Sequence, residues 1–430
     1  MGRLGCGPVE PRATCPPDPM PFPSTVLRRL VRLAASLAAL PLAAPATAQS
    51  YVQDARAVAT VPAMLGRGDA GVALPTRETS FFVNPAHVAA TEGKFHLSLF
   101  GLGAGGTAAA VDVVRQLYYR ETTYEFCDLN GDGQDDYCET SAAVDGAALA
   151  AETRRPLGGH GTLLLPSVSF RSGSLGVSAG TFLQSTVRVQ SAATATGDSL
   201  YAFMQTDGIA AVTVSATLPA YVTVGAGLRY VRRFASTDDF DAADTAGMND
   251  PAYAEAGGVA FDAGAFWRTP VAGLDAALAV YNLGAAMDYV PSEFFGGIGS
   301  DVTLADAEGV AANMNRRGSA PSFRAGFAYR PTLPESVPFQ MVLLADYVSA
   351  STTTYVQSAV QHLRLGAEAQ ISGAFAARAG FGGGGPSLGA TLNLRVLKLD
   401  YALYSQRSGR FEAGEDGGFR HALLLRLGLD

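Results

Sequence analysis

The segment YVTVGAGLRYVRR, residues 221–233, alternates bulky apolar residues with small or polar ones at every second position. The apolar face consists of Val222, Val224, Ala226, Leu228 and Tyr230. The opposite face carries Thr223 and Arg229 together with two glycines. Because successive side chains of a β-strand point to opposite faces, this pattern predicts a strand with one apolar and one polar face. Residues 361–371 and 390–404 show the same alternation, so we expect a β-sheet protein.

Similar segments follow one another from residue 94 onward, and we count about fourteen candidate strands. They are expected to begin near Lys94, Thr162, Leu175, Ile209, Tyr221, Gly258, Leu274, Ser322, Val337, Val356, Ala374, Leu388, Lys398 and Phe419. The composition agrees with this count, because 49 glycines and only 16% charged residues favour strands and turns over helices.

The connections between these strands alternate in length. Tight turns are expected at 172–174, 219–220, 269–272, 330–335 and 372–373. Long connections are expected at 107–160, 189–206, 234–256, 284–319, 349–355 and 407–418. An even number of strands, with short turns on one side and long loops on the other, is typical of outer-membrane barrels. The predicted fold class is all-β: a transmembrane antiparallel β-barrel of about 14 strands.

A soluble β-sandwich shares the alternation, but its solvent face should carry Lys, Glu and Thr. Here many positions of the polar face are Gly, Ala or Ser mixed with charges. The aromatic residues toward strand ends, typical of an interfacial girdle, are Phe95, Tyr230, Trp267, Tyr329, Tyr347 and Tyr401. We therefore expect the barrel to be surrounded by outer-membrane lipid, in the cell outer membrane of a Gram-negative bacterium.

Residues 1–48 predict an export signal. An apolar stretch runs from about Leu33 to Ala44 and ends at the small-residue cleavage site Ala46-Thr47-Ala48. The basic residues that precede it are Arg28, Arg29 and Arg32. This order is that of a secretory signal peptide, which we expect to be cleaved after Ala48. The segment before Met20 fits neither a signal nor a fold, so we expect Met20 to be the true start.

Charge and motifs argue against two other classes of protein. The formal net charge of −8 is spread thinly, without the basic patch of a nucleic-acid binder, so no nucleic acid is expected as a partner. The sequence GVSAG at 176–180 matches a nucleophile elbow, but it lies within an alternating strand instead of a strand-to-helix turn. The five histidines show no metal-binding spacing. We expect no catalytic residues and no enzymatic activity.

The region before the strands contains the most specific motif, MLGRGDAGVALPTRETSFFVNPAHVA, residues 64–89. It resembles the N-terminal region of the PorV/PorQ (UPF0164-like) branch of the FadL-type outer-membrane barrels. The matching positions are Gly68, Ala70, Gly71, Val72, Ala73, Asn84, Pro85 and Ala86. Further short matches follow in order at 225–229, 261–264, 282–284, 323–326 and 399–402. The chain departs from the usual pattern at its end, where Leu429-Asp430 replaces the common terminal aromatic residue.

The resemblance implies a barrel over 94–430 and a hatch over 49–93 inside its lumen. The residues agree with that role, because Gly68 and Gly71 permit positive φ or close backbone approach, while Asn84-Pro85 favours a turn. Charged residues on the polar faces are expected in the lumen, where they pair with one another, hold the hatch or contact a substrate. They are Arg229, Asp262, Arg324, Arg364, Glu368, Arg395, Lys398, Asp400 and Arg426.

The resemblance implies two different functions. The PorV/PorQ branch suggests an accessory of type IX protein secretion, with secreted proteins or the secretion machinery as partners. The wider FadL-type family suggests passive transport of hydrophobic ligands across the outer membrane. A general porin is disfavoured because residues 49–93 should block the lumen. Protein binding predicts apolar loop tips, whereas uptake predicts an apolar pocket beside Asn84-Pro85-Ala86.

The first long connection contains CDLNGDGQDDYC, residues 127–138. Its oxygen-bearing residues have the spacing of a twelve-residue calcium loop, at Asp128, Asn130, Asp132, Gln134, Asp136 and Glu139. A solvated acidic loop is the alternative. Because exported proteins keep disulfides, Cys127 and Cys138 are expected to pair and to hold the ends of a structural Ca²⁺ site at 127–139.

Removal of calcium from the refolded protein should increase protease sensitivity around residues 120–145. The physical reason is that neighbouring carboxylates repel one another without the ion. Limited proteolysis with and without a chelator measures this, and equal cleavage would count against the site.

Overall fold

A computed structural model describes part of the unit Ala48–Asp430. The described residues are 61–76, 83–107, 122–127, 136–141, 157–194, 197–241, 252–284, 288–292, 304–315, 321–334, 336–349, 362–371, 373–383, 385–407 and 416–429. The predicted signal peptide and the start at Met20 lie outside them.

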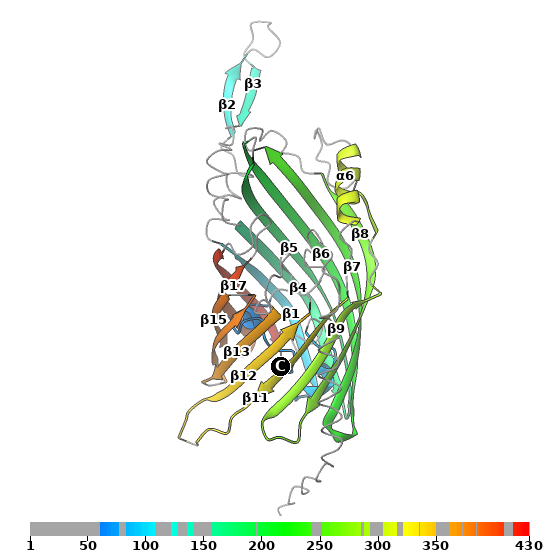
Figure 1. Cartoon of the computed structure of the whole chain (residues 1–430), viewed down its shortest axis with the longest axis vertical. Coiled ribbons are helices and arrows are strands. Elements are labelled where there is room, and N and C mark those ends of the chain that lie inside the picture. The colour runs from blue at the N-terminus through cyan, green and yellow to red at the C-terminus, as the bar shows by residue number, and fades with distance from the viewer. Residues whose placement is uncertain are drawn as a thin grey trace, which may run out of the picture. The chain divides into compact units, whose positions relative to one another are not determined.

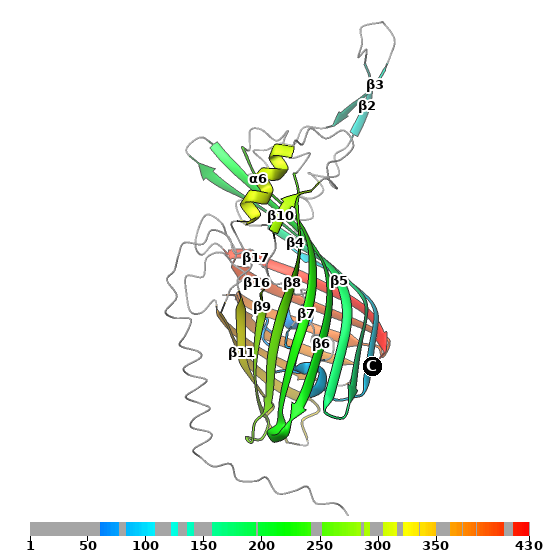
Figure 2. The ribbon, with the colours of Figure 1, turned by 90° about the vertical axis from the view of Figure 1, so that its right-hand side faces the viewer.

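Fourteen antiparallel strands form one closed ring (Figures 1 and 2). Around the ring the order is β8-β7-β6-β5-β4-β1-β17-β16-β15-β14-β13-β12-β11-β9, and β9 pairs with β8 to close it. The strands are β1 Phe95–Gly106, β4 Leu157–Ser172, β5 Leu175–Thr194, β6 Gly197–Leu218, β7 Val222–Asp241, β8 Ala254–Arg268, β9 Leu274–Leu283, β11 Ser322–Tyr329, β12 Gln340–Val348, β13 Leu363–Gln370, β14 Phe375–Gly382, β15 Gly385–Asn393, β16 Leu397–Arg407 and β17 Asp416–Leu429. The predicted all-β barrel of 14 strands is confirmed.

The alternation in sequence separates the two faces of the wall. In β17, Leu423 and Leu425 are exposed on the outside, whereas Leu424 and Arg426 are buried toward the lumen. Apolar side chains such as Leu102, 58% exposed, cover the outer face of other strands as well. A wall of this kind is stable only where hydrocarbon replaces water, and a closed ring leaves no strand edge unpaired there. The protein is therefore an outer-membrane barrel.

The strands extend further than the sequence pattern predicted. The expected long connection at 189–206 is wrong, because β5 and β6 pair from Leu175–Ala216 to Thr194–Gly197. The connection expected at 234–256 is shorter than predicted, because β7 continues to Asp241 and β8 begins at Ala254. These strand ends are rich in Ser, Thr, Asp and Gln. A polar sequence was taken for a loop, but ladder hydrogen bonds hold a strand together even where no apolar face is required.

Two of the long connections contain further elements. The connection after β1 includes β2 Thr122–Cys127 and β3 Asp136–Ser141, which form a hairpin. The connection after β9 includes β10 Asp288–Pro291, which pairs with β8, and helix α6 Leu304–Asn315. Small side chains allow α6 to pack closely on β7, β8 and β10, in a buried cluster of Ala235, Ala252, Ala254, Ala256, Tyr289, Ala307, Val310 and Ala311. Within the described residues, no helix has the length and hydropathy needed to cross a membrane.

A substitution on the outer face of the wall tests whether this face contacts lipid. Leu102 is paired with Leu163 of β4 and Leu425 of β17. We expect Leu102→Arg to destabilise the barrel by about 2–4 kcal/mol, the cost of an arginine that faces lipid near the bilayer midplane. Leu102→Phe, which keeps the position apolar, is the control. Denaturant unfolding in lipid vesicles measures both, and an arginine variant as stable as the phenylalanine variant would contradict the membrane-facing assignment.

Candidate functional site

Residues 61–76 and 83–91, here named the luminal segment, lie inside the ring (Figure 2). They include the short helices α2 Pro62–Leu65 and α3 His87–Ala90. Ala70, Val72 and Asn84 have no exposed surface. The first part of the segment contacts strands β11 to β17 and also reaches β5 and β6 through Val61 and Met64, whereas the second part contacts β4 to β9. These residues belong to the predicted hatch, and together they span the lumen from one side of the wall to the other.

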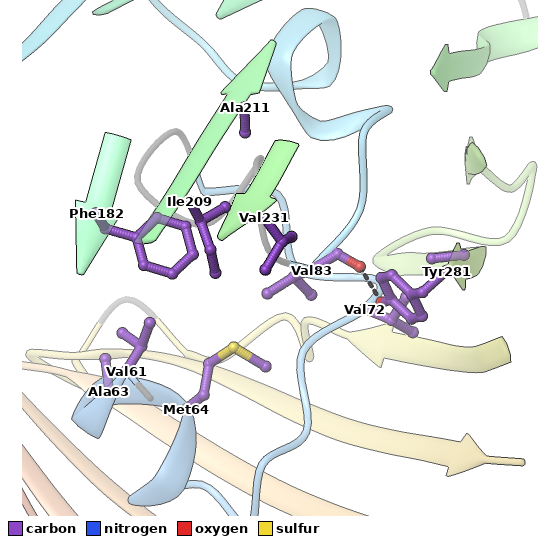
Figure 3. Close-up of a cluster of buried hydrophobic side chains, with 11 residues drawn as sticks. Val61, Ala63, Met64, Val72, Val83, Phe182, Ile209, Ala211, Val231 and Tyr281 are labelled. Atoms are coloured by element: carbon purple, nitrogen blue, oxygen red, sulfur yellow. Dashed lines mark hydrogen bonds between the residues drawn. The ribbon is translucent and has the colours of Figure 1, made fainter. Parts of the chain in front are cut away.

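An apolar cluster joins the segment to one side of the wall (Figure 3). Val61, Met64 and Val83 of the segment pack toward Phe182 of β5 and Ile209 of β6. The remaining members are Ala63, Val72, Ala211, Val231, Ala279 and Tyr281. The Tyr281 hydroxyl donates a hydrogen bond to the Val83 carbonyl, which satisfies the polar group of this otherwise apolar side chain. Burial of each of the larger side chains stabilises the arrangement by about 1.5–3 kcal/mol.

Wall glycines allow the backbone of the segment to approach the strands. A Cβ atom at Gly382 would lie 1.9 Å from the Gly68 carbonyl oxygen, and one at Gly380 would lie 2.2 Å from the Arg67 carbonyl carbon. Gly68 itself has a φ of 71°, which L-residues with side chains rarely adopt. On the other side of the lumen, a Cβ at Gly225 would lie 2.4 Å from the backbone of Pro85. Glycine is therefore required on both partners of the Gly68–Gly382 contact and on the wall side of the contact with Pro85.

Buried charges hold the first part of the luminal segment. Arg67 lies 3.0 Å from Glu368, and Asp69 lies 2.6 Å from Arg324. The Asp346 carboxylate accepts hydrogen bonds from the backbone N–H groups of Gly71 and Val72, at 2.7 and 2.9 Å. Removing one partner of a buried ion pair leaves an uncompensated charge and typically costs about 3–5 kcal/mol.

The same network continues around the wall. Arg378 lies 2.6 Å from Glu368, and it donates to Thr391, which in turn donates to Asp400. Asp400 also accepts a hydrogen bond from Arg426. The predicted lumen residues Glu368, Asp400 and Arg426 are thus brought together in one chain of contacts.

Other predicted lumen residues have separate partners. Arg229 is paired with Asp262 at 2.6 Å and also donates to Asn282. Arg364 lies 3.7 Å from Asp69. Arg395 is not part of the network, because it lies in the turn between β15 and β16 with a φ of 70° and an exposed side chain.

Asn84 connects the two parts of the luminal segment with the wall. Its side-chain N–H₂ donates to the carbonyls of Val72 and Ala265, at 3.3 and 3.1 Å, while its Oδ1 accepts the N–H of Ala86 at 3.0 Å. Only an amide carries two donors and an acceptor on so short a side chain. This geometry explains the Asn-Pro-Ala sequence at 84–86.

His87 is completely buried beside Asn84. Its Nε2 lies 2.8 Å from the Val72 carbonyl oxygen, and its ring meets Phe266 edge to face with centroids 6.3 Å apart. Burial, with a further contribution from the charge of Arg67, lowers the pKa of His87 from its ordinary 6.5 to about 4. The neutral imidazole therefore belongs to the folded state.

Sequence reasoning missed several members of the site, namely Arg67, Asp69, Asp207, Arg233, Asp346 and Arg378. Strand parity could have identified Arg233, Asp346 and Arg378, since each occupies an inward position of an alternating segment. Arg67 and Asp69 lie outside any periodic pattern, so nothing in the sequence assigned them a partner.

The described backbone does not test the predicted calcium site. Residues 128–135 lie outside the described residues, and Asp136 and Glu139 belong to strand β3. Cys127 is paired with Asp136, and Cys138 is paired with Glu125, so the two cysteines do not face each other across the ladder. The Ca²⁺ loop and the disulfide stay predictions.

An irregularity of the wall affects the neighbouring strands β1 and β4. In β1 the inward positions change from even to odd numbers between Ser98 and Gly101, and in β4 they change between Leu164 and Ser167. No ladder partner is present for Leu99, Leu165 or Pro166 on either side of their strands. Pro166 also lacks a backbone N–H, and prolines in sheets are confined to such bulges and to edges. We name this irregularity the wall break.

A groove and a cavity lie beside the wall break and share part of their lining. The groove, about 600 Å³, lies on the lipid-facing side, with Ala179, Gly180 and Ala210 between larger side chains of neighbouring strands. These larger side chains are Leu97, Val168, Val212, Leu228, Tyr230 and Val259. The cavity, about 50 Å³, is lined by inward-facing residues such as Phe182 and Arg426 and by exposed residues of the turn after β15, such as Arg395. Ser167, Gly180 and Thr181 line both.

The position of these two spaces differs from the prediction. The transport alternative predicts an apolar pocket beside Asn84-Pro85-Ala86, whereas the groove and the cavity described above are lined by other residues than those of the luminal segment. On the wall side, Asn84 and Pro85 are in close contact with Gly264 and Gly225.

Neither the family models nor the curated proteins yield a match to this chain. Three solved structures are similar to it over most of its length. The toluene transporter TbuX of Ralstonia pickettii shares 12% identity over 86% of this chain and 98% of its own, with a TM-score of 0.47. The toluene transporter TodX of Pseudomonas putida shares 10% over 88% and 98%, with a TM-score of 0.44. A FadL homologue of Pseudomonas aeruginosa shares 14% over 86% and 97%, with a TM-score of 0.39. These structures are FadL-type outer-membrane barrels.

The glycine contacts predict a specific packing defect. Gly380→Ala would place a methyl group against the backbone of Arg67, and we expect this overpacking to cost about 1–3 kcal/mol and to release residues 61–76 from the wall. Gly373→Ala is the matched control, because a Cβ there meets nothing within 4 Å. Limited proteolysis of the folded barrel measures the release. Equal protection of the segment in both variants would show that it is not seated on Gly380.

The buried histidine predicts acid sensitivity. The pKa of His87 is about 4 in the folded protein and the ordinary 6.5 in the unfolded chain. As the pH falls, the histidine of the unfolded chain therefore binds a proton first. Stability should therefore be unaffected above pH 7, decline as the pH falls from about 6.5 to 4, and lose about 3 kcal/mol in total. His87→Gln, which keeps a donor for the Val72 carbonyl, should remove this part of the decline. Denaturant unfolding of both proteins from pH 7 to pH 4 measures their free energies of unfolding. An equal decline of this free energy with pH in wild type and His87→Gln would refute the assignment.

Proposed function

We propose that the protein mediates passive transport of apolar small molecules between the barrel lumen and the surrounding lipid, through the wall break. The observation that carries the proposal is that Ser167, Gly180 and Thr181 line both the lipid-side groove and the inner cavity. Side chains add little to the wall at this point, because Gly180 has none and Ser167 is small.

The luminal segment makes an axial route costly. Displacing it would break the buried pairs of Arg67 and Asp69, the hydrogen bonds to Asp346, and the apolar cluster around Met64. A route through the wall break requires none of these changes. Since transfer of apolar surface from water to hydrocarbon is favourable by about 25 cal/mol per Å², the movement needs no energy source.

The lining of the groove matches apolar ligands. Leu97, Val168, Val212, Leu228 and Val259 present only hydrocarbon, and Tyr230 adds an aromatic ring. The groove carries no charged side chain. Such a surface offers dispersion contacts and no hydrogen-bonding selectivity, so it supports a range of hydrophobic molecules.

The secretion-accessory function implied by the PorV/PorQ resemblance depends on other parts of the chain. It requires apolar tips on the long connections, and most of those residues lie outside the described ranges. No described contact favours it over transport, so secreted proteins are not proposed as partners.

Filling the groove should block transport. Ala210→Trp places an indole on the groove floor, whereas Leu388→Trp, on the outer face of β15 and 58% exposed in the parent, serves as the control. We expect uptake of a neutral alkylbenzene into vesicles with a lipopolysaccharide outer leaflet to fall to the protein-free rate in Ala210→Trp only. Unchanged uptake in Ala210→Trp, or no protein-dependent uptake at all, would overturn the proposed route.

A further inference from the structure

The inner cavity differs from the groove in its charge. Its lining contains Arg395, Lys398 and Arg426 together with His96, and no Asp or Glu. Asp400, which binds Arg426 from the next inward position of β16, is the nearest compensating carboxylate on the same strands. The cavity therefore has a positive balance, whereas the groove on the other side of the wall has no charged residue at all.

The cations are arranged on one side of the cavity. Arg395 lies in the turn Leu394–Val396, Lys398 is the second residue of β16, and Arg426 faces Lys398 across the β16–β17 ladder. Apolar residues, including Leu164, Leu165 and Phe182, form the side next to the wall break. The combination of cationic and apolar sides is that of a site for an amphiphile.

The height of the wall break within the membrane determines which leaflet a bound amphiphile would contact. The turn at 394–396 is one of the short turns, which outer-membrane barrels place on the periplasmic side. Leu99 is the fifth residue of β1, only about 13 Å along the strand from its periplasmic end at ~3.3 Å per residue. The apolar band of such barrels is about 25 Å tall, and the strands are tilted. The break therefore opens in the half of the wall that faces the periplasmic leaflet.

We infer that the cavity binds the phosphate head of a single-chain amphiphile whose alkyl chain lies in the groove outside the wall. The shared residues Ser167, Gly180 and Thr181 mark where the chain crosses. A phosphate monoester presents three oxygen acceptors to donors from several directions, which suits cations from a turn and two strands better than a carboxylate with two acceptors does. The small cavity excludes a bulky two-chain head, because it holds only about 50 Å³.

This inference shares the wall break with the transport route proposed above, but it concerns binding and not passage. Its test therefore uses equilibrium binding, which can fail while uptake of neutral molecules persists, and can succeed while such uptake is absent.

The experiment measures binding of dodecyl phosphate to the full mature barrel in phosphatidylcholine nanodiscs, with empty nanodiscs subtracted. The variant Arg395→Gln/Lys398→Gln removes two cations that are exposed or half-buried, so it should fold. Lys94→Gln, an exposed position at the same rim that does not line the cavity, controls for the general surface charge. We expect dodecyl phosphate to bind about tenfold more weakly to the double variant and equally well to Lys94→Gln.

Three further ligands distinguish the chemistry. Dodecanol should bind the wild-type protein no better than the double variant, and dodecanoate should bind less tightly than dodecyl phosphate. Inorganic phosphate alone should not bind measurably. Equal binding of dodecyl phosphate to wild type and double variant would overturn the inference. So would binding of dodecanol or dodecanoate as tight as that of the phosphate, or binding of inorganic phosphate without a chain.

Discussion

The requirement that every peptide group in hydrocarbon find a partner within the protein determines this structure. A sheet meets that requirement only when it has no edge, and the pairing of β9 with β8 removes the last one. Closure then divides the side chains into two environments. Leucine and valine on the outside meet lipid, which frees the inside for charges, glycines and the luminal segment.

In the interior, the backbone groups of the luminal segment also need hydrogen-bond partners, and side chains provide them. The luminal segment has little regular structure, with only two four-residue helices among its described residues. Its backbone groups are therefore satisfied by side chains, as Asp346 does for Gly71 and Val72 and Asn84 does for Ala86. Irregular backbone is tolerated at membrane depth because the surrounding wall buries it and supplies these partners.

The sequence predicted the fold well because strand periodicity records which environment each residue faces. The segment 221–233 identifies one face as lipid-exposed, and parity places Arg229 in the lumen, where it pairs with Asp262. The polar extensions of β5, β6 and β7 were missed, since their pairing leaves no apolar signature. The partners of Arg67 and Asp69 are more than 250 positions away in sequence, so local patterns could not identify them. The wall break was missed because, in the sequence, a change of the inward positions from even to odd numbers looks like an ordinary interruption of the alternating pattern.

The wall break is the exception that gives the barrel its proposed route, and hydrogen exchange tests it directly. In nanodiscs, the amides of Leu99 and Leu165, which lack ladder partners, should exchange much faster than those of Leu102 and Leu163, which are paired with each other. Uniform protection across β1 and β4 would show that the ladder is continuous there, and would contradict a passage between lumen and lipid at this point.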